Sequence, residues 1–357
     1  MTENWTLLVG RDDISRTRLD DVAMPEVASG EALLKVDRVG LTANNVTYAV
    51  LGDAFKYWQF FPAPDGWGRF PLWGFADVVE SSADGVEVGD RYYGYYPSSS
   101  HLLVAPGRID ARGFRDTSTH RAELPSPYNV YAKTTGDSAY EPDREDLLVL
   151  YRPLFYTSFM LADKLWDNDY YGAEVVALSS ASSKTAYGAA FLMKGSGPQI
   201  VGLTSAGNVA FTESLGCYDL VLSYDQIEQL DPSIPTAYVD LAGSSELRVA
   251  LHEHLRDGLV HDAVVGITQQ DSTPIGTLTG PRPTVFFAPE QMRKRTEDWG
   301  REKLDDAFGE AWRRFAPAAE EWVDIVTSTG PEALRDVWLE VLGGKSAPRD
   351  GNVLVFP

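Results

Sequence analysis

The pattern of apolar and polar residues is clearest at positions 174–194. Four apolar residues at 175–178 suit a buried strand, and five small or polar residues follow at 179–183 as a tight turn. Apolar residues then recur at i, i+3, i+4 and i+7 and share one helical face: Ala186, Ala189, Ala190 and Met193. The stretch predicts a strand, a turn and a helix, which is the opening of a βαβ unit.

The turn before this predicted helix has the composition of a phosphate site. The first turn of a helix has unpaired N–H groups and a partial positive charge, which together favour an anion. Side-chain hydroxyl and ammonium groups add donors, at Ser180, Ser182, Ser183, Lys184 and Thr185. An ordinary strand–helix connection has similar residues, because a small-residue turn is a weak motif. Both interpretations stay open.

The chain after residue 147 alternates predicted strands with predicted helices. Further strands are expected at 199–204, 218–223, 236–241, 258–267 and 283–288. Helices are expected at 147–165, where Pro153 interrupts the pattern, and at 206–215, 246–256, 290–326 and 331–342. This alternation predicts a parallel, doubly wound sheet of the α/β class. The final strand pattern, at 351–357, has no evident neighbour.

The first half of the chain reads differently. Strand patterns at 5–9, 31–39, 75–80 and 101–104, separated by turns, predict a small antiparallel barrel. Residues 40–53 form a short helix or turn. Residues 54–71, rich in aromatic residues and proline, predict a long ordered loop, and the polar tract 112–146 predicts a connection.

Charge and cysteine content narrow the possible partners and location. The net charge of −21 argues against nucleic acid and anionic membranes, since both require clustered Lys and Arg. The single cysteine, Cys217, cannot form an internal disulfide, so a reducing cytoplasm is expected, and it excludes a multi-cysteine zinc site. Neither a signal-peptide pattern nor a membrane span is evident. We interpret Cys217 as a buried small residue and not as a nucleophile.

Several signatures in this order resemble one superfamily. They are VGDRYYG at 88–94, the preceding strand stretch from 71, TSAGNVAFTESLGCYDLVLSY at 204–224, VDLAGSS at 239–245 and the closing helix and strand from 331. The chain resembles the medium-chain dehydrogenase/reductase superfamily, on its zinc-free quinone- and enoyl-reductase side. More narrowly, RPLFYTSF and SSASSKTAYGAAF resemble an uncharacterised branch known as a domain of unknown function.

The resemblance implies a fold and an activity. It implies a GroES-like antiparallel barrel domain, 1–145 plus 327–357, and a Rossmann-type dinucleotide-binding domain, 146–326. It implies zinc-independent hydride transfer from NADPH to an activated C=C or C=O of a small molecule, and a homodimer. The aromatic loop hints at an apolar or aromatic substrate, although packing explains it equally well. Zinc-binding members use Cys and His in the barrel, where this chain has only His101, near the end of the barrel pattern.

The nucleotide site departs from the family pattern. Ser182, Ser183 and Thr185 stand where the resemblance places glycines, and each adds bulk near the pyrophosphate position. After the second strand, Thr204 and Ser205 occur in place of the acid that binds the ribose of NAD, which favours NADP. No Arg or Lys lies within 199–215 to pair with a 2′-phosphate, and a plain helix cap is an equal interpretation.

The resemblance also indicates residues for the chemistry. Thr157 aligns with a Thr beside the nicotinamide, and Tyr224 could stack or bond near the ribose. Three residues fall where zinc-free members place polar cleft groups: Asn44, Asn45 and Tyr48. A tyrosine hydroxyl could donate a proton and an asparagine could hold a carbonyl oxygen. A core aromatic and turn-forming asparagines are the alternatives.

Arg152 and the rival functions complete the predictions. Arg152 could bind an anionic part of the substrate or cofactor, or form an interdomain salt bridge.

The string SSKT at 182–185 lacks the earlier glycine of an NTPase phosphate loop, and the G-x-S-x-G motif of a hydrolase is absent. The main rival is a non-catalytic nucleotide-binding or sensor protein that keeps the reductase fold.

Overall fold

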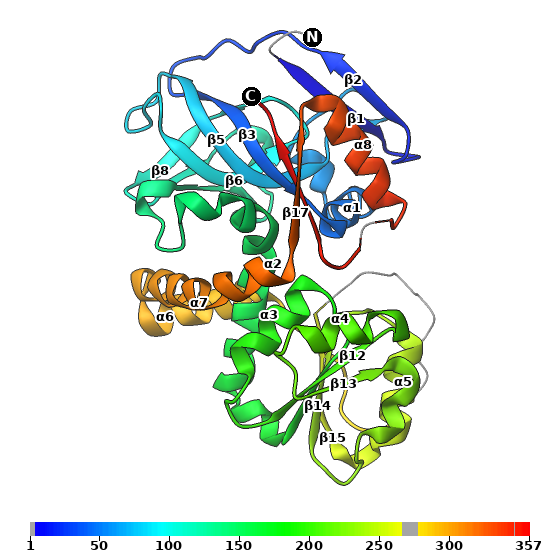
Figure 1. Cartoon of the computed structure of the whole chain (residues 1–357). Helices are drawn as coiled ribbons and strands as arrows, with labels where there is room; N and C mark the ends of the chain where they lie inside the picture. Colours follow the sequence, from blue (N-terminus) through cyan, green and yellow to red (C-terminus); the bar gives the residue numbers. More distant parts are fainter. Residues whose placement is uncertain (1–3, 266–277, 346) are drawn as a thin grey trace. The chain divides into compact units, whose positions relative to one another are not determined.

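The computed structural model describes residues 4–265, 278–345 and 347–357 (Figure 1). The chain divides into two compact units. The first combines Met1–Pro153 with Ala319–Pro357, and the second is Leu154–Ala318. Both limits fall inside long helices, α2 (Glu145–Asp167) and α7 (Arg301–Trp322). The predicted domain limits at 145/146 and 326/327 lie close to these positions and stay a prediction.

The first unit is built on two sheets, antiparallel except for one pair. The smaller sheet has the order β2-β1-β4, with β1 (Trp5–Gly10), β2 (Thr17–Asp21) and β4 (Trp67–Gly68). The larger has the order β17-β18-β3-β5-β6-β10-β9-β8, with β7 on β3. Its strands are β3 (Ala32–Leu41), β5 (Pro71–Ser81), β6 (Arg91–Pro97), β7 (His101–Val104), β8 (Pro106–Asp110), β9 (Gly113–Asp116), β10 (Val130–Lys133), β17 (Asp324–Thr329) and β18 (Asp350–Val355).

Two α-helices of the described residues lie wholly within this unit, α1 (Ala43–Val50) and α8 (Pro331–Leu342). Apolar residues of α8 recur at helical spacing and are buried: Leu334, Val337, Trp338 and Val341. Trp338 stacks on Phe70 with ring centroids 4.1 Å apart, and its indole N–H donates to the carbonyl of Ile14 at 2.9 Å. The closing helix therefore packs into the core of the β domain, to which it belongs although it is distant in sequence.

Two expectations for this part of the chain were wrong, and the final strand, which had no evident neighbour in the sequence, has two. The tract 112–146 is not only a connection, because it contributes β9 and β10 to the larger sheet. Residues 324–326, expected at the end of the helix 290–326, belong instead to β17, in agreement with its β-branched residues. The final strand, β18, has neighbours on both sides: it pairs in parallel with β17 and antiparallel with β3.

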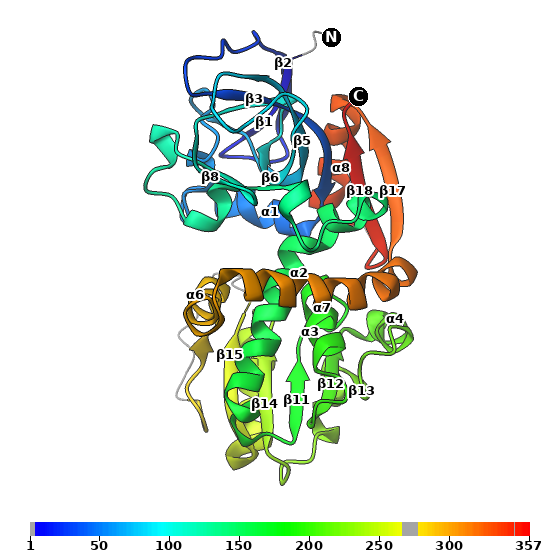
Figure 2. The ribbon, with the colours of Figure 1, turned by 90° about the vertical axis from the view of Figure 1, so that its left-hand side faces the viewer.

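The second unit contains a parallel sheet with the order β13-β12-β11-β14-β15-β16 (Figure 2). The strands are β11 (Val175–Leu178), β12 (Gln199–Thr204), β13 (Leu220–Ser223), β14 (Thr236–Asp240), β15 (Leu259–Val264) and β16 (Thr284–Val285). Its other helices are α3 (Lys184–Met193), α4 (Val209–Ser214), α5 (Ser245–Leu255) and α6 (Ala288–Trp299). Part of the predicted strand 258–267 lies outside the described residues.

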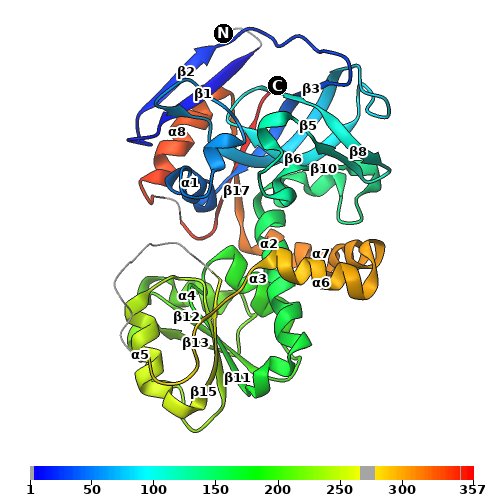
Figure 3. The same cartoon turned by 180° about the vertical axis from the view of Figure 1, so that it is seen from behind.

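Helices cover both faces of this parallel sheet. Leucines of α5 pack on one face against alternate strand residues such as Val175, Ala177 and Val201, and Figure 3 shows α5 on the side of the sheet away from α2 and α3. The predicted combination of an antiparallel β domain and a doubly wound parallel sheet is therefore confirmed.

Helix α2 runs through Pro153, where the sequence predicts a break. Proline removes one backbone hydrogen bond from a helix, but residues on both sides, Tyr151 and Phe155, are completely buried. We attribute the continuity of the helix to this packing. Within the described residues, no helix is long and apolar enough to cross a membrane.

Candidate active site

The turn at 179–183 lies at the carboxyl end of β11, and α3 begins directly after it. Ser183 is the N-cap of α3: its Oγ accepts the N–H of Ala186 at 3.3 Å. Ser180 has a φ of +51°, in the left-handed region that favours glycine. The unusual backbone position of the turn is therefore Ser180 and not 182, 183 or 185, where the resemblance places glycines.

The strand order reverses beside this turn. β11 pairs with β12 on one side and with β14 on the other, so the chain winds outward from β11 in both directions. Open α/β sheets bind ligands outside the carboxyl ends of their strands at such a reversal. The predicted phosphate turn thus has the location that a dinucleotide site requires.

Three polar side chains meet beside the turn. Thr204 Oγ1 donates to Ser182 Oγ at 3.4 Å, and Asn208 Nδ2 donates to the same oxygen at 3.2 Å. These contacts link the turn after β11 with the loop after β12, which are the two segments predicted to bind the cofactor. Ser205, by contrast, is exposed and starts a 3-10 turn (Ala206–Asn208) without a side-chain cap. Asn208 was missed because a lone Asn in a loop has no distinctive sequence signal.

Tyr224 also reaches the turn. Its hydroxyl oxygen accepts the backbone N–H of Ser180 at 3.1 Å, and burial raises the pKa of the phenol. Tyr224 thus contacts the turn after β11, whereas its predicted role near the ribose stays a prediction. The bond also occupies one N–H group that a phosphate could otherwise use.

A residue of α2 that contacts the first turn of α3 is Ser158, next to the predicted Thr157. Ser158 Oγ donates to the carbonyl of Thr185 at 2.7 Å. Gly188 of α3 makes this close approach possible, because a Cβ there would lie 2.7 Å from Ser158 Oγ. Ser158 is fully buried, whereas Thr157 is half-buried. The nicotinamide role of Thr157 stays a prediction.

A buried carboxylate organises the loop after β14. Asp240 Oδ1 accepts the hydroxyl of Ser179 at 2.9 Å and the N–H groups of Ala242 and Gly243 at 3.1 and 2.9 Å. Its Oδ2 pairs with Arg248 at 2.5 Å. The loop N–H groups therefore face the protein and not a ligand. Asp240 lies in the VDLAGSS segment, but no local pattern predicts these partners.

These residues fit a dinucleotide through neutral donors. A ten-residue helix starts at the turn, and the hydroxyls of Ser182 and Thr204 lie at the adjoining loop, with Lys184 in the first turn of α3. No Arg or Lys occurs between 199 and 223, so the loop after β12 supplies no cation for a 2′-phosphate. The set fits phosphate and ribose groups, with hydroxyl and amide donors in place of glycine N–H groups and arginine.

The predicted catalytic residues of the first unit lie on α1. Asn45 is buried, and its amide bonds to the backbone on both sides: Oδ1 accepts the N–H of Thr42 at 2.7 Å, and Nδ2 donates to the carbonyl of Pro71 at 2.9 Å. Together with the Thr42 side chain this forms a capping box. The geometry favours the turn-forming alternative for Asn45 over a catalytic role.

Asn44 and Tyr48 are one helical turn apart and in contact. The Tyr48 hydroxyl oxygen accepts Asn44 Nδ2 at 2.8 Å and Trp73 Nε1 at 3.2 Å. Both partners are donors, so these bonds leave the phenol proton unused. Burial raises the pKa of Tyr48 well above its ordinary value. Tyr48 is therefore held neutral, with two N–H groups in place to stabilise negative charge on its oxygen.

An aromatic cluster surrounds Tyr48. The rings of Tyr57, Tyr95 and Tyr128 lie 4.8, 5.6 and 6.3 Å from it, centroid to centroid. The hydroxyls of Tyr95 and of nearby Tyr93 are buried without a hydrogen-bond partner in the described part of the chain. Tyr48 is thus part of an aromatic core, which was the alternative to a catalytic role. Its hydroxyl nevertheless keeps the hydrogen bonds to Asn44 and Trp73.

Arg152 already has a partner within its own unit. Its guanidinium forms an ion pair with Asp137 and lies over the ring of Tyr93 at 4.5 Å. Both Asp137 and Arg152 belong to the first compact unit, so this is not the interdomain salt bridge offered as the alternative. An anionic ligand would have to share the guanidinium with Asp137.

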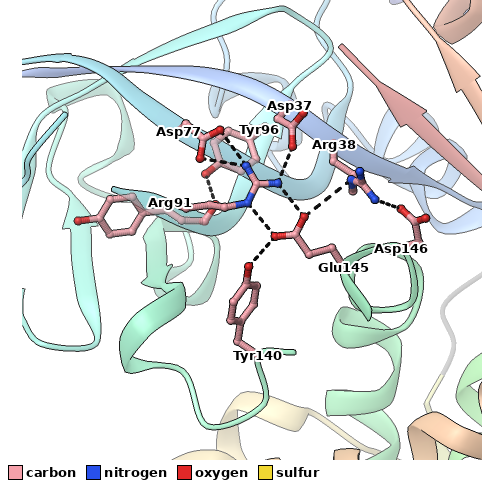
Figure 4. Close-up of polar contacts among 9 residues, drawn as sticks. Asp37, Arg38, Asp77, Arg91, Tyr96, Tyr140, Glu145 and Asp146 are labelled. Carbon is pink, nitrogen blue, oxygen red and sulfur yellow. Dashed lines mark hydrogen bonds and ion pairs between the residues drawn. The ribbon is translucent and has the colours of Figure 1, made fainter. Parts of the chain in front are cut away.

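The arginine of the VGDR signature is structural. Figure 4 shows the guanidinium of Arg91 among three carboxylates, Asp37, Asp77 and Glu145. The distances are 2.5, 2.9 and 2.7 Å. Arg91 therefore ties β3, β5 and β6 to the first residue of α2.

The described residues contain no cluster of metal ligands, and the single thiol is buried. Across 4–265, 278–345 and 347–357, no group of three or more His, Cys, Asp or Glu is arranged to hold a metal ion. Cys217 is buried, and burial raises the pKa of its thiol to about 12. At neutral pH it is a protonated thiol, which is a poor nucleophile.

Solved structures with the same fold include a quinone oxidoreductase and an enoyl reductase. CurA in complex with NADPH from Vibrio vulnificus matches with a TM-score of 0.63 and 13% identity, with 99% of each chain covered. The quinone oxidoreductase from Coxiella burnetii gives 0.57 and 13%, with 99% of each chain covered. The CurK enoyl reductase gives 0.55 and 13%, with 100% of each chain covered. At such identities the likeness shows the fold, and it confirms the GroES-like and Rossmann-type combination.

The sequence comparisons give the family. No curated protein matches the chain. The family model described as "Protein of unknown function (DUF2855)" matches residues 39–347. The chain therefore belongs to the DUF2855 family, a branch of unknown function with the fold of the medium-chain quinone and enoyl reductases.

Proposed function

We propose that the protein is a zinc-independent oxidoreductase that uses NADPH to reduce an activated C=C or C=O of a small molecule. The observation that carries this proposal is the junction of the 179–183 turn, the start of α3 and the Ser182–Thr204–Asn208 contacts at the reversal of strand order. The NADPH bound by CurA, a protein of the same fold, is consistent with this choice of cofactor. A homodimer and a cytoplasmic location remain part of the proposal.

The cofactor residues would act by binding and orientation. Bound NADPH would supply the hydride, which is one proton together with two electrons. The hydroxyls of Ser182 and Thr204 would bind ribose or phosphate oxygens, and Lys184 would provide a charge near the phosphates. Ser180, Ser183, Thr185, Ser205, Tyr224 and Thr157 complete the proposed cofactor-binding set.

Tyr48 would supply the proton. Hydride addition leaves a carbanion or an alkoxide on the substrate, and the phenol O–H of Tyr48 would protonate it. The resulting phenolate would receive the N–H groups of Asn44 and Trp73, which already bond this oxygen, and water would later return the proton. Arg152 is retained as a proposed substrate contact, and Asn45 would hold the start of α1.

A fluorescence titration of the purified protein with NADPH, and separately with NADH, tests the cofactor. We expect enhanced nicotinamide emission and tighter binding of NADPH. Ser182→Arg should weaken the binding of NADPH at least tenfold, because the added side chain fills the junction with Thr204. The control, Ser233→Arg, lies in an exposed turn of the same unit and should bind NADPH normally. Lys184→Ala should also weaken binding. Unchanged affinity in both Ser182→Arg and Lys184→Ala would reject the site.

Turnover tests the acid. Tyr48→Phe should lower kcat about 10²-fold or more on an enone, quinone or aldehyde, with NADPH binding unchanged. If Tyr48→Phe turned the substrate over as fast as the wild type, Tyr48 would not be the acid.

The alternative is a non-catalytic nucleotide-binding or sensor protein with the same fold. It is favoured by the Ser180 N–H group that Tyr224 occupies and by the serines in place of glycines. Binding of a nucleotide without turnover of any of these substrates would favour the alternative. Failure of both nucleotides to bind would favour a sensor that uses neither.

A further inference from the structure

The aromatic loop, residues 54–71, contributes to a pocket that the proposed function does not use. The pocket has a volume of about 290 Å³ and is lined by Arg11, Trp58, Gln59, Pro62, Ala63 and His120. This volume lies just below the range of about 300–1,000 Å³ that is usual for small-molecule sites. Three lining residues are apolar or aromatic and two are basic, and none is acidic.

Arg69 is bonded to a residue that lines this pocket, Pro62, and has no carboxylate partner in the described residues. Its guanidinium donates to the carbonyl of Pro62, a lining residue. Burial lowers the pKa of Arg69, and across 4–265, 278–345 and 347–357 it forms no ion pair. The chain has 52 acidic and 31 basic residues, so carboxylates are abundant. Arg91 and Arg152 in the same unit both have carboxylate partners. A half-buried cation is costly unless an anion compensates it.

Arg11 adds a second cation with a weak partner. Its Nε donates to the carbonyl of Trp67 at 2.9 Å, and its guanidinium lies 5.9 Å from the ring centroid of Trp58. Its carboxylate partner, Asp53, is 3.9 Å away and 77% exposed. Such an exposed and distant pair contributes little, so the guanidinium can serve a ligand.

His120 completes the polar wall. Its Nε2 lies 3.2 Å from the carbonyl oxygen of Phe60. Burial lowers the pKa of the imidazole, and the positive charges of Arg121 and Arg69 lower it further. Arg121 itself is buried and paired with Asp116 at 3.2 Å. An anion near His120 would oppose these effects and raise the pKa of the ring.

We propose that this pocket binds a small organic oxyanion, with its carboxylate or phosphate group on Arg11 and Arg69 and its apolar body against Trp58, Pro62 and Ala63. The guanidinium groups provide charge and paired N–H donors that match either oxyanion. The site lies within the first unit and does not depend on the proposed cofactor or on Tyr48. It gives the aromatic loop a binding function.

Calorimetric titration without nucleotide tests the site, with benzoate, inorganic phosphate and the neutral analogue benzyl alcohol as probes. We expect saturable binding of at least one anion and much weaker binding of benzyl alcohol. Preference for benzoate or for phosphate identifies the acid group. Arg69→Gln should weaken the binding at least tenfold. Arg335→Gln, an exposed arginine beside Asp336, is the matched control and should bind normally.

A second readout is the pH titration of the His120 ring by NMR. The ring signal is assigned by its absence from the spectrum of His120→Gln. Bound anion should raise the pKa of the ring in the wild type and not in Arg69→Gln. If Arg69→Gln does not fold, Arg11→Gln replaces it, with the same expected weakening. The proposal is overturned if neither anion binds saturably, if benzyl alcohol binds as tightly as benzoate, or if the variant binds like Arg335→Gln.

Discussion

The phenol oxygen of Tyr224 accepts the backbone N–H of Ser180, 44 residues earlier in the chain, at 3.1 Å. Ser180 has left-handed backbone geometry within the proposed phosphate turn. Non-glycine residues hold this conformation at a cost, which surrounding contacts must offset. Tyr224 therefore stabilises the turn in the geometry that the proposed site needs.

Tyr224→Phe tests this relationship. We expect a loss of about 1 kcal/mol in the free energy of unfolding, the value of one hydrogen bond. NADPH should bind about three- to tenfold more weakly, because the turn loses a contact that fixes Ser180. Tyr171→Phe is the matched control, since the Tyr171 ring stacks on His261 and no hydrogen bond of its hydroxyl is found in the described residues. Tighter nucleotide binding in Tyr224→Phe would mean instead that the phenol competes with the phosphate.

The predicted elements that the structure confirms have strong apolar periodicity. The 174–194 pattern gives β11, the turn and α3 because strand and helix faces there are buried almost completely. β17 was missed because its residues are mostly exposed, so burial imposes no alternation on it. β9 and β10 are four residues each and, unlike β11, lack four consecutive apolar residues.

The sequence predicts the location of the candidate site better than it predicts the contacts between its residues. Small residues after a buried strand indicate a turn, and Thr204 follows from the same rule at β12. The roles of Ser158, Asn208 and Asp240 depend on partners 27, 26 and 61 residues away, which no local pattern specifies. Asn45 has the same limitation, since its partner Pro71 lies on β5.

The contact between Gly188 and Ser158 can be tested by a double-mutant cycle. Gly188→Ala should destabilise the protein by about 1–3 kcal/mol, because the new Cβ would lie 2.7 Å from Ser158 Oγ. Ser158→Ala alone should cost less, about 1 kcal/mol, for the lost bond to Thr185. The double variant should be more stable than the sum of the two losses predicts, since Ser158→Ala removes the clashing oxygen. Urea unfolding measures all four proteins.

If the losses in the free energy of unfolding were additive in that cycle, the clash in Gly188→Ala would be relieved by separation of α2 and α3 and not by removal of the Ser158 oxygen. Gly207→Ala is the control, because a Cβ there meets no atom within 4 Å.

The buried tyrosines predict a loss of stability in alkali. Burial raises the pKa of Tyr48, Tyr93 and Tyr95 above the ordinary value of 10.0. Above that value the unfolded chain releases phenol protons that the folded protein retains, so the free energy of unfolding falls as pH rises. Tyrosinate absorbance should therefore appear together with unfolding. Gradual ionisation of all tyrosines in the folded protein would contradict this.

Tyr95→Phe separates the effect of one hydroxyl. The Tyr95 hydroxyl is buried without a hydrogen-bond partner in the described residues, so its removal should leave stability at neutral pH unchanged or raise it by about 1 kcal/mol. The variant should also lose less stability in alkali than the wild type. A loss above about 2 kcal/mol at neutral pH would show that the hydroxyl has a partner, such as a buried water.

The Arg91 network predicts a dependence on acid with the opposite sign. Burial of Glu145 tends to raise its pKa, but hydrogen bonds from Arg91 and Tyr140 and the charges of Arg91 and Arg38 outweigh burial, and the pKa is lowered from 4.5. A lowered pKa contributes stability that is present above 4.5 and is lost as pH falls through the folded value. Glu145→Gln should therefore cost about 2 kcal/mol at about pH 7, less than a fully buried pair, because the Arg91 side chain is 19% exposed.

The difference between the wild type and Glu145→Gln should shrink as pH falls, because protonation removes the same charge from the wild type. Chemical unfolding at about pH 7 and about pH 3 measures this difference. Asp336→Asn, which alters an exposed pair with Arg335, should show almost no difference at either pH. If the difference in the free energy of unfolding between the wild type and Glu145→Gln stayed constant with pH, Arg91 would be held mainly by Asp37 and Asp77. The start of α2 would then be held to the sheet by packing, such as the close approach of Gly40 to the Val149 carbonyl.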